Sequence, residues 1–346
     1  MIFMFQSEEN SNKKEASYYE KMENNNVQCH LCPVNCTISP GNVGACDARE
    51  NIDGTLYTNN YGLVSSENLD PIEKKPLFNF LPGKKALSIG TLGCNMACEY
   101  CQNWRISQPD PEDFNKFKTR RTKPEKIIEK AKNYSIIAYT YNEPTIWYEF
   151  VKDTAKLAHK NNVKNVLVTN GYINEKPFRE LAPYIDAMNI DIKSFNDNFY
   201  RKLCHVPNGK QSKETAKIAH QLGIHIELTY LIITDENDDI KDIKKFIDWV
   251  KSIDTEIPVH FSRYFPQYKM DNPATNIKTL EKAYKLAKEE GLSYVYMGNV
   301  RKKGTEDTYC PNCGQKIVER SGYTLKKNKI KNGKCEYCDQ PINGVF

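Results

Sequence analysis

The sequence contains no long hydrophobic run and no strong excess of one charge. No stretch approaches the 18 or so apolar residues that a membrane-spanning helix needs. The apolar residues 1–5 are far fewer than the core of a signal peptide requires, and polar residues follow at once. The 49 basic and 44 acidic side chains give a net charge of +5, too even to indicate binding to nucleic acid or to an anionic membrane. We therefore expect a cytoplasmic protein without a membrane or nucleic-acid partner.

Cysteine is too sparse for a disulfide-stapled fold, although 12 cysteines are many for a chain of 346 residues. Eleven of them lie in three tight groups, and such spacing indicates metal binding. The twelfth, Cys204, stands alone, and its ordinary interpretation is a small buried apolar side chain. The three groups are Cys29, Cys32, Cys36 and Cys46; Cys94, Cys98 and Cys101; and Cys310, Cys313, Cys335 and Cys338.

The central group lacks a fourth ligand. Its C-x₃-C-x₂-C spacing supplies three thiolates, and neither cysteine nor histidine occurs between Cys101 and His159. A structural zinc site needs four ligands, and an iron–sulfur cluster that only transfers electrons normally has four as well. The group therefore predicts a [4Fe–4S] cluster with one iron left open for a substrate or cofactor.

Short apolar runs alternate with amphipathic stretches from residue 85 onward, which is the pattern of repeated βα units. Such repeats imply parallel strands with helices outside, and they predict an α/β partial barrel over residues 63–304. We expect a flexible tail or a loosely docked helix at 1–26, a cysteine-rich metal-binding segment at 27–62 and a small module at 305–346. The expected strands of the barrel are 86–92, 135–141, 165–169, 187–192, 225–233, 258–264 and 294–297.

Polar residues follow three successive expected strands, next to the cysteine group that follows the first. They are Asn142 with Glu143, Thr169 with Asn170, and Asp191 with Lys193. In barrels of parallel strands the reacting groups lie at the carboxyl ends of the strands. Each pair alone is a common helix start, turn or ion pair, but together they predict a cofactor pocket beside the cluster.

The whole order of motifs resembles the radical S-adenosylmethionine (radical SAM) enzymes, and in particular the radical SAM component of the AmmeMemoRadiSam system. It also resembles, more distantly, the activases of glycyl radical enzymes, a group that includes pyruvate formate-lyase-activating enzymes. The resemblance runs nearly end to end through residues 29–46, 101–104, 139–145, 260–266 and 296–300 and through the terminal cysteine pairs.

This resemblance implies a set of roles for matching positions. The three central cysteines would hold the [4Fe–4S] cluster, and S-adenosylmethionine would complete the coordination of its open iron. The implied cofactor contacts are Tyr100 near the adenine, Asn142 and Glu143 at the ammonium, Thr169, Asn170, Asp191 and Lys193 at the ribose and carboxylate, and His260 near the adenosine. One departure is Val168, because glycyl radical activases tend to have an acid there, so the resemblance does not carry over a monovalent cation site that uses that acid.

The implied activity is reductive cleavage of S-adenosylmethionine to a 5′-deoxyadenosyl radical that abstracts hydrogen from a small molecule or a protein. No side chain is assigned as a general acid or base for this step. The implied partners are an electron donor of the flavodoxin or ferredoxin type and either a glycyl radical enzyme or a companion AmmeMemoRadiSam protein. The alternative is a metal-stabilised binding or scaffold protein without turnover.

The two flanking cysteine groups differ in how clearly they indicate a metal. Two C-x₂-C pairs separated by 21 residues, at Cys310 to Cys338, predict a zinc-ribbon-like module. The amino-terminal C-x₂-C-x₃-C-x₉-C group fits either zinc or a second iron–sulfur cluster, because the ligand type does not distinguish them. We favour zinc there, and we interpret His30 as an exposed bystander.

Overall fold

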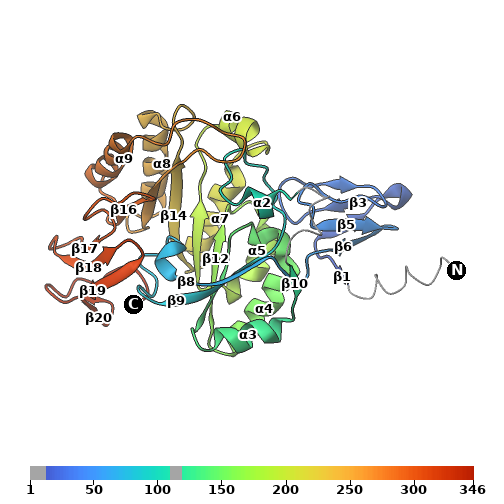
Figure 1. The fold of residues 1–346 in the computed structure, drawn as a ribbon, viewed down its shortest axis with the longest axis horizontal. Coiled ribbons are helices and arrows are strands. Elements are labelled where there is room, and N and C mark those ends of the chain that lie inside the picture. The colour runs from blue at the N-terminus through green and yellow to red at the C-terminus, as the bar shows by residue number, and fades with distance from the viewer. Residues whose placement is uncertain (1–12, 110–118) are drawn as a thin grey trace.

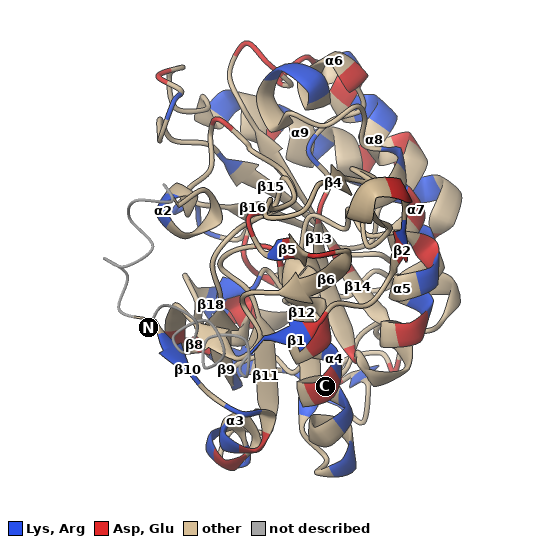
Figure 2. Cartoon of the chain, turned by 90° about the vertical axis from the view of Figure 1, so that its right-hand side faces the viewer, with Lys and Arg blue, Asp and Glu red and all other residues tan. Residues whose placement is uncertain are grey.

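The computed structural model describes residues 13–109 and 119–346. Figure 1 shows a central sheet with helices along one side of it, between a group of short amino-terminal strands at one end and a group of carboxyl-terminal strands at the other. None of the helices in this part of the chain is both long and apolar enough to cross a bilayer. Acidic and basic residues are interspersed along the outer helices (Figure 2), in keeping with the nearly balanced charge of the sequence.

The central sheet has the strand order β16-β15-β14-β13-β12-β11-β9-β8, so β16 and β8 form its two edges. From β9 to β16 every neighbouring pair is parallel and follows the order of the chain. This arrangement confirms the expected series of βα units. The parallel strands are β9 (Lys85–Gly90), β11 (Ile136–Tyr139), β12 (Lys164–Thr169), β13 (Ala187–Asp191), β14 (His225–Ile232), β15 (Val259–Arg263) and β16 (Val295–Gly298).

The helices turn an apolar face to this sheet. In α8 the residues Ile243, Phe246, Ile247 and Val250 recur at helical spacing and are all fully buried. Burial of each such side chain contributes about 1.5–3 kcal/mol, so the apolar stripe anchors the helix. The helical segments are η3 (Ile72–Lys74), α2 (Trp104–Ser107), α3 (Pro124–Ala131), η5 (Pro144–Trp147), α4 (Tyr148–Lys160), α5 (Glu175–Leu181), η6 (Ala182–Tyr184), α6 (Asp197–Phe199), the π-helix η7 (Tyr200–Cys204), α7 (Lys210–Gln221), α8 (Ile240–Ile253) and α9 (Ile277–Glu289).

One strand of the central sheet was not expected from the sequence. Strand β8 (Ser66–Pro71) pairs antiparallel with β9 along its whole length. Its sequence, Ser-Glu-Asn-Leu-Asp-Pro, is polar and ends in proline, which suits a strand at the edge of a sheet. Its pairing comes from the neighbouring strand rather than from its own apolar pattern.

The amino-terminal region differs from the expected tail. Residues 14–26 are neither a tail nor a helix of any length, because β1 pairs with β6 and β2 pairs with β3, and only a 3₁₀ turn, η2 (Glu23–Asn25), is helical. Residues 1–12 lie outside the described part of the chain. The strands of this region are β1 (Lys14–Glu15), β2 (Tyr19–Lys21), β3 (Val27–Cys29), β4 (Thr37–Ile38), β5 (Arg49–Ile52), β6 (Thr55–Thr58) and β7 (Leu63–Val64), the last paired with β10 (Arg120–Arg121).

The polar residues of 14–26 fold because later strands supply the partners that they lack. Ala16 donates its backbone N–H to Leu56 O at 2.8 Å, and its side chain is only 4% exposed. Backbone pairing satisfies groups that a free segment would leave to water. Composition alone could not reveal these partners.

The carboxyl-terminal module packs against the segment that precedes β9. Arg320 is buried there, and it donates a hydrogen bond to Phe78 O at 2.6 Å while its guanidinium lies 4.6 Å from the centre of the Phe78 ring. Phe80 also forms a bridge with Val345 near the end of the chain. The strands of the module are β17 (Thr308–Tyr309), β18 (Lys316–Ser321), β19 (Thr324–Asn328), β20 (Ile330–Lys331) and β21 (Lys334–Cys335).

Candidate cofactor site at the carboxyl ends of the strands

A cavity of about 480 Å³ lies at the carboxyl ends of the parallel strands. This volume is in the range of pockets that bind small molecules and cofactors. The three central cysteines line it together with seven of the eight expected cofactor residues, namely Tyr100, Asn142, Glu143, Thr169, Asn170, Asp191 and Lys193. The structure therefore brings together residues that the sequence separates by as many as 99 positions, from Cys94 to Lys193.

The loop that carries the three cysteines follows β9 and is held by hydrogen bonds to the π-helix η7. Ala97 N donates to Cys204 O at 3.0 Å, and Glu99 N donates to Leu203 O at 2.9 Å. Gly93 begins the loop with a φ of 96°, and a Cβ there would lie 2.3 Å from Cys46 O. Only glycine fits this position, because other residues avoid that φ and would collide with the carbonyl.

Asn142 fixes the same loop from the second strand end. Its Oδ1 accepts a hydrogen bond from Thr91 N at 3.0 Å, and its Nδ2 donates to Gly93 O at 2.8 Å. Both polar atoms of the amide are therefore engaged with the backbone just before Cys94. The side chain lines the cavity as expected, but its contacts show a second task, which is to hold the cysteine loop in place.

Glu143 joins the second and third strand ends. Its Oε1 accepts from Thr169 Oγ1 at 2.6 Å and from Thr145 N at 2.9 Å, and its Oε2 accepts from Asn170 N at 2.8 Å. Burial raises the pKa of this carboxyl above its ordinary value, although these donors act in the opposite direction. Its side chain is thus a fixed acceptor on the cavity wall.

Asp191 and Lys193 form an ion pair at the fourth strand end, with 2.5 Å between Oδ2 and Nζ. Burial opposes the charge on Lys193, but Asp191 and the Cys98 thiolate outweigh it and raise the lysine pKa above its ordinary value. The other oxygen, Asp191 Oδ1, is buried and has no hydrogen-bond partner among the described residues. Asp191 as a residue lines the cavity, and a carboxylate there suits a ligand that carries a hydroxyl or ammonium group.

Tyr100 and Cys204 pack together behind the cysteine loop. The Tyr100 hydroxyl lies 3.3 Å from Cys204 Sγ, and both side chains are buried. Lys193 Nζ lies 5.8 Å from the centre of the Tyr100 ring. The structure confirms that Cys204 is a small buried side chain, and it shows that this residue supports the loop.

His260 is the one expected cofactor residue that does not line this cavity. It lines an adjoining cavity of about 420 Å³, where its Nε2 lies 2.6 Å from Glu227 Oε2. Burial raises the pKa of Glu227, but hydrogen bonds to His225 and His260 outweigh it and lower this pKa to about 2. The two cavities share wall residues, which are Pro76, Ser262, Asn299 and Tyr323.

Sequence reasoning missed several residues of the larger cavity. Tyr141 and Asn189 lie on or after strands that were identified, so their position at a strand end was the available signal. Lys75 comes from the segment before β9 and had no such signal. It donates to Asp70 Oδ2 at 2.7 Å, and the Tyr141 hydroxyl donates to the same oxygen at 2.5 Å.

The carboxyl-terminal cysteines form a compact group. Cys310 Sγ lies 3.6 Å from Cys338 Sγ, and Cys313 Sγ lies 3.8 Å from Cys335 Sγ. All four sulfurs lie within 4.8 Å of one another, and among the described residues no other set of three or more histidine, cysteine or acidic ligands is so compact. This group could hold a single metal ion.

Comparison with known proteins identifies the family. Residues 88–250 match the Radical SAM superfamily. An uncharacterized protein of Methanocaldococcus jannaschii is 46% identical over 339 residues, which cover 96% of this chain and 100% of that protein. The chain belongs to the radical SAM superfamily.

Relatives within the superfamily include glycyl-radical activating enzymes. The pyruvate formate-lyase 1-activating enzyme of Escherichia coli is 22% identical over 157 residues, which cover 42% of this chain and 61% of that enzyme. A putative glycyl-radical enzyme activating enzyme of M. jannaschii is 25% identical over 60% of this chain and 78% of its own length. Among solved structures, Streptococcus suis SuiB bound to S-adenosylmethionine aligns with a TM-score of 0.49 and 13% identity over 66% of this chain and 53% of that one.

Radical SAM proteins use a [4Fe–4S] cluster and S-adenosylmethionine, and the residues of the larger cavity fit both. Three thiols from one loop face the cavity, and Met96 N donates to Cys94 Sγ at 3.5 Å, as suits a thiolate ligand. The carboxylate residues Glu143 and Asp191 line the same cavity. The donor set matches a cluster with an open iron and a polar cofactor beside it.

Proposed function

We propose that this chain is a radical SAM enzyme in which Cys94, Cys98 and Cys101 hold the [4Fe–4S] cluster. The observation that carries this proposal is the placement of three thiols from one loop on the wall of a 480 Å³ cavity whose other walls are polar strand ends. A closed structural site would surround its metal with protein ligands, whereas this group leaves one side open to the cavity.

The chemistry itself would come from the cofactors. When bound, the cluster and S-adenosylmethionine supply a one-electron cleavage of the carbon–sulfur bond, which gives methionine and a 5′-deoxyadenosyl radical. The protein would bind and orient the cofactor and exclude water, and no side chain needs to transfer a proton in this step.

Named side chains of the cavity would hold the cofactor. Glu143, which three donors fix in place, would accept a hydrogen bond from the ammonium group, and the Asp191 carboxylate would accept one from a ribose hydroxyl. Lys193 would pair with the carboxylate, and Tyr100 would pack near the adenine. Asn142 would act mainly through the loop that it clamps.

We assign the hydrogen-donating substrate to the adjoining cavity of about 420 Å³. A radical generated in the first cavity would have to reach its target C–H bond directly, and the two cavities share Ser262 and Asn299. His260 would then border the substrate rather than the adenosine, held by Glu227. The donor would be a small molecule or a segment of a protein, as in the AmmeMemoRadiSam and activase settings, with a flavodoxin or ferredoxin as the electron source.

We further propose that the carboxyl-terminal group binds zinc. Four thiolates placed tetrahedrally at about 2.3 Å from one zinc ion lie about 3.8 Å apart. The two sulfur–sulfur distances of 3.6 and 3.8 Å agree with this value. Zinc would link the two cysteine-bearing turns of the carboxyl-terminal module, which packs against the segment before β9.

The test of the main proposal is anaerobic reconstitution with iron and sulfide, followed by reduction with dithionite in the presence of S-adenosylmethionine. We expect release of 5′-deoxyadenosine and methionine in equal amounts, and none when dithionite or S-adenosylmethionine is omitted. A protein that loads its cluster and binds S-adenosylmethionine but releases no product, with or without the companion proteins, would support a binding or scaffold role instead.

A further inference from the structure

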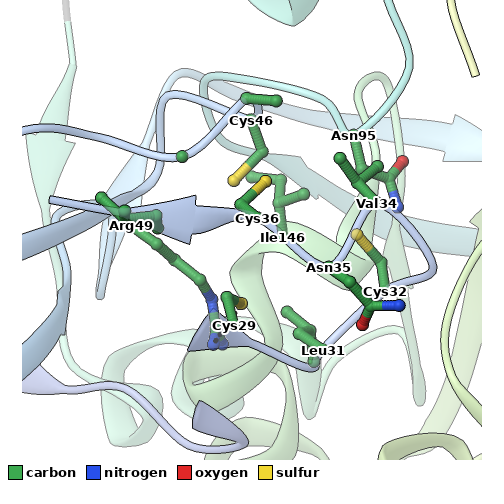
Figure 3. A pocket seen from close by; sticks show the side chains of 13 residues that line it. Cys29, Leu31, Cys32, Val34, Asn35, Cys36, Cys46, Arg49, Asn95 and Ile146 are labelled. Carbon is green, nitrogen blue, oxygen red and sulfur yellow. Dashed lines mark hydrogen bonds between the residues drawn. The ribbon is translucent and has the colours of Figure 1, made fainter. Parts of the chain in front are cut away.

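The four amino-terminal cysteines surround a single cavity. Cys29 ends β3, Cys32 and Cys36 lie in the loop before β4, and Cys46 lies in the loop before β5. Figure 3 shows their four sulfurs pointing into the same space. His30 is not part of this wall, because its side chain is exposed and pairs with Glu20 at 3.5 Å.

The four sulfurs are spread more widely than the ligands of a single zinc ion. Four sulfurs at about 2.3 Å from one zinc would lie about 3.8 Å apart and would form a compact group. The amino-terminal group lacks the compactness of the carboxyl-terminal group, whose sulfurs all lie within 4.8 Å of one another in the described chain. A four-iron cluster keeps its thiolates farther apart, because the iron–sulfide cube stands between them.

The wall of the cavity carries a buried positive charge. Arg49 is 1% exposed, and its Nη1 donates to Cys29 Sγ at 3.7 Å while its Nη2 pairs with Glu149 Oε1 at 2.6 Å. A positive charge at this position would balance part of the negative charge of a cluster held by four thiolates. The rest of the wall is largely apolar, with Leu31, Val34, Ile38 and Ile146.

Glycine lets the backbone approach the sulfurs closely. Gly44 lines the cavity, and a Cβ there would lie 3.1 Å from Ile38 Cδ1 and 3.7 Å from Cys36 Sγ. The neighbouring Asp47 has a positive φ of 57°, which turns the chain after Cys46. The loop of residues 44–47 therefore follows the wall of the cavity and does not fill it.

The cavity adjoins the central cysteine loop. Asn95, which follows Cys94 directly, lines it, and Cys46 O lies against Gly93 at the start of that loop. Asn95 also accepts a hydrogen bond from Asn170 Nδ2 at 2.9 Å, and Asn170 lines the larger cavity, so the walls of the two sites are in contact.

We propose that Cys29, Cys32, Cys36 and Cys46 bind a second [4Fe–4S] cluster with four protein ligands, next to the central cluster. A cluster with all its irons ligated by protein serves electron transfer. It would take one electron from an external low-potential donor and be reduced, and it would be oxidised again when that electron passes to the central cluster. The site itself does not depend on the proposed function, whereas the relay does.

Metal counting in matched variants tests the site. A variant with Cys94, Cys98 and Cys101 all replaced by Ala should keep about four irons and the one zinc after reconstitution, while the wild type holds about eight irons, since each cluster has four. A single Cys36→Ser variant should lose the amino-terminal irons and keep the central cluster. A triple variant that binds two zinc ions and no iron would overturn the proposal.

Electron paramagnetic resonance of the reduced wild type tests the proposal without any substitution. Two overlapping signals are expected, and only one should change when S-adenosylmethionine is added, because only the central cluster has an open iron. A single signal that shifts completely would refute the second cluster. Neither readout requires cofactor cleavage, so failure of the proposed function would leave these results unchanged.

Discussion

The central and carboxyl-terminal cysteine groups are built on opposite plans. The central thiols come from one loop and face a cavity of about 480 Å³, whereas the four carboxyl-terminal thiols come from two separate turns and lie within 4.8 Å of one another. The first group would leave room for a ligand beside a bound metal, and the second would surround a metal with four thiolates. Catalytic and structural metal sites differ in the same way.

The largest expected effect concerns the central cysteine group, which faces the larger cavity. Cys98→Ala removes one of three cluster ligands and should abolish 5′-deoxyadenosine formation, while the melting temperature stays within a few degrees and the zinc content is unchanged. Cys204→Ala is the matched control, because it truncates a neighbouring buried cysteine that is no ligand. It should keep cofactor cleavage and lose about 1 kcal/mol of stability. Equal loss of cleavage in both variants would contradict the assignment.

The second substitution concerns the compact carboxyl-terminal cysteine group. Cys313→Ala should release the zinc and unfold the carboxyl-terminal module, because a structural zinc supplies on the order of 10 kcal/mol of folding free energy in small zinc modules. Limited proteolysis and zinc analysis would measure this, with iron content as the control. If the variant kept its zinc and resisted protease like the wild type, the carboxyl-terminal cysteine group would have no structural role.

A third substitution tests the buried charge beside the amino-terminal group. Glu149→Ala leaves Arg49 buried without its partner and should cost about 3–5 kcal/mol in chemical denaturation. Replacing both residues, Arg49→Met with Glu149→Leu, should recover much of that loss. Zinc at the carboxyl-terminal group should not change, and a change there would mean that the two ends are coupled.

The smallest effect is expected from Glu143→Gln. The amide retains one acceptor oxygen where the carboxylate has two, so at least one of its three donors loses a partner, at a cost of about 1–3 kcal/mol. We expect weaker binding of S-adenosylmethionine by titration calorimetry and a slightly lower melting temperature. Wild-type affinity in this variant would remove Glu143 from the cofactor site.

Much of the fold could be predicted from periodicity, and the failures have a physical cause. All seven expected strands are present, since each carries its own apolar run. Strand β8 and the strands within residues 14–26 are polar, and they form because a neighbour supplies hydrogen bonds. The residues of such a strand do not by themselves predict the strand with which it pairs.

The candidate site shows the same division. Strand ends predicted Glu143 and Asp191 on one cavity wall, because parallel strands finish at the same edge of a sheet. His260 also lies on a strand that was identified, but its side chain turns to the adjoining cavity, where Glu227 holds it. The His260 ring also packs against Phe78, from the segment before β9, and against Tyr296, and no local sequence pattern specifies these contacts.

The sequence by itself determined how many thiols each group offers and the order of strands that carries them, since both are properties of spacing and periodicity. Only the tertiary structure decided how far apart those thiols lie. The sulfurs of the carboxyl-terminal group close to 3.6 and 3.8 Å, while those of the amino-terminal group stand around a cavity of about 20 Å³. Such distances depend on where separate loops are anchored by backbone pairing and buried partners, which spacing along the chain does not specify.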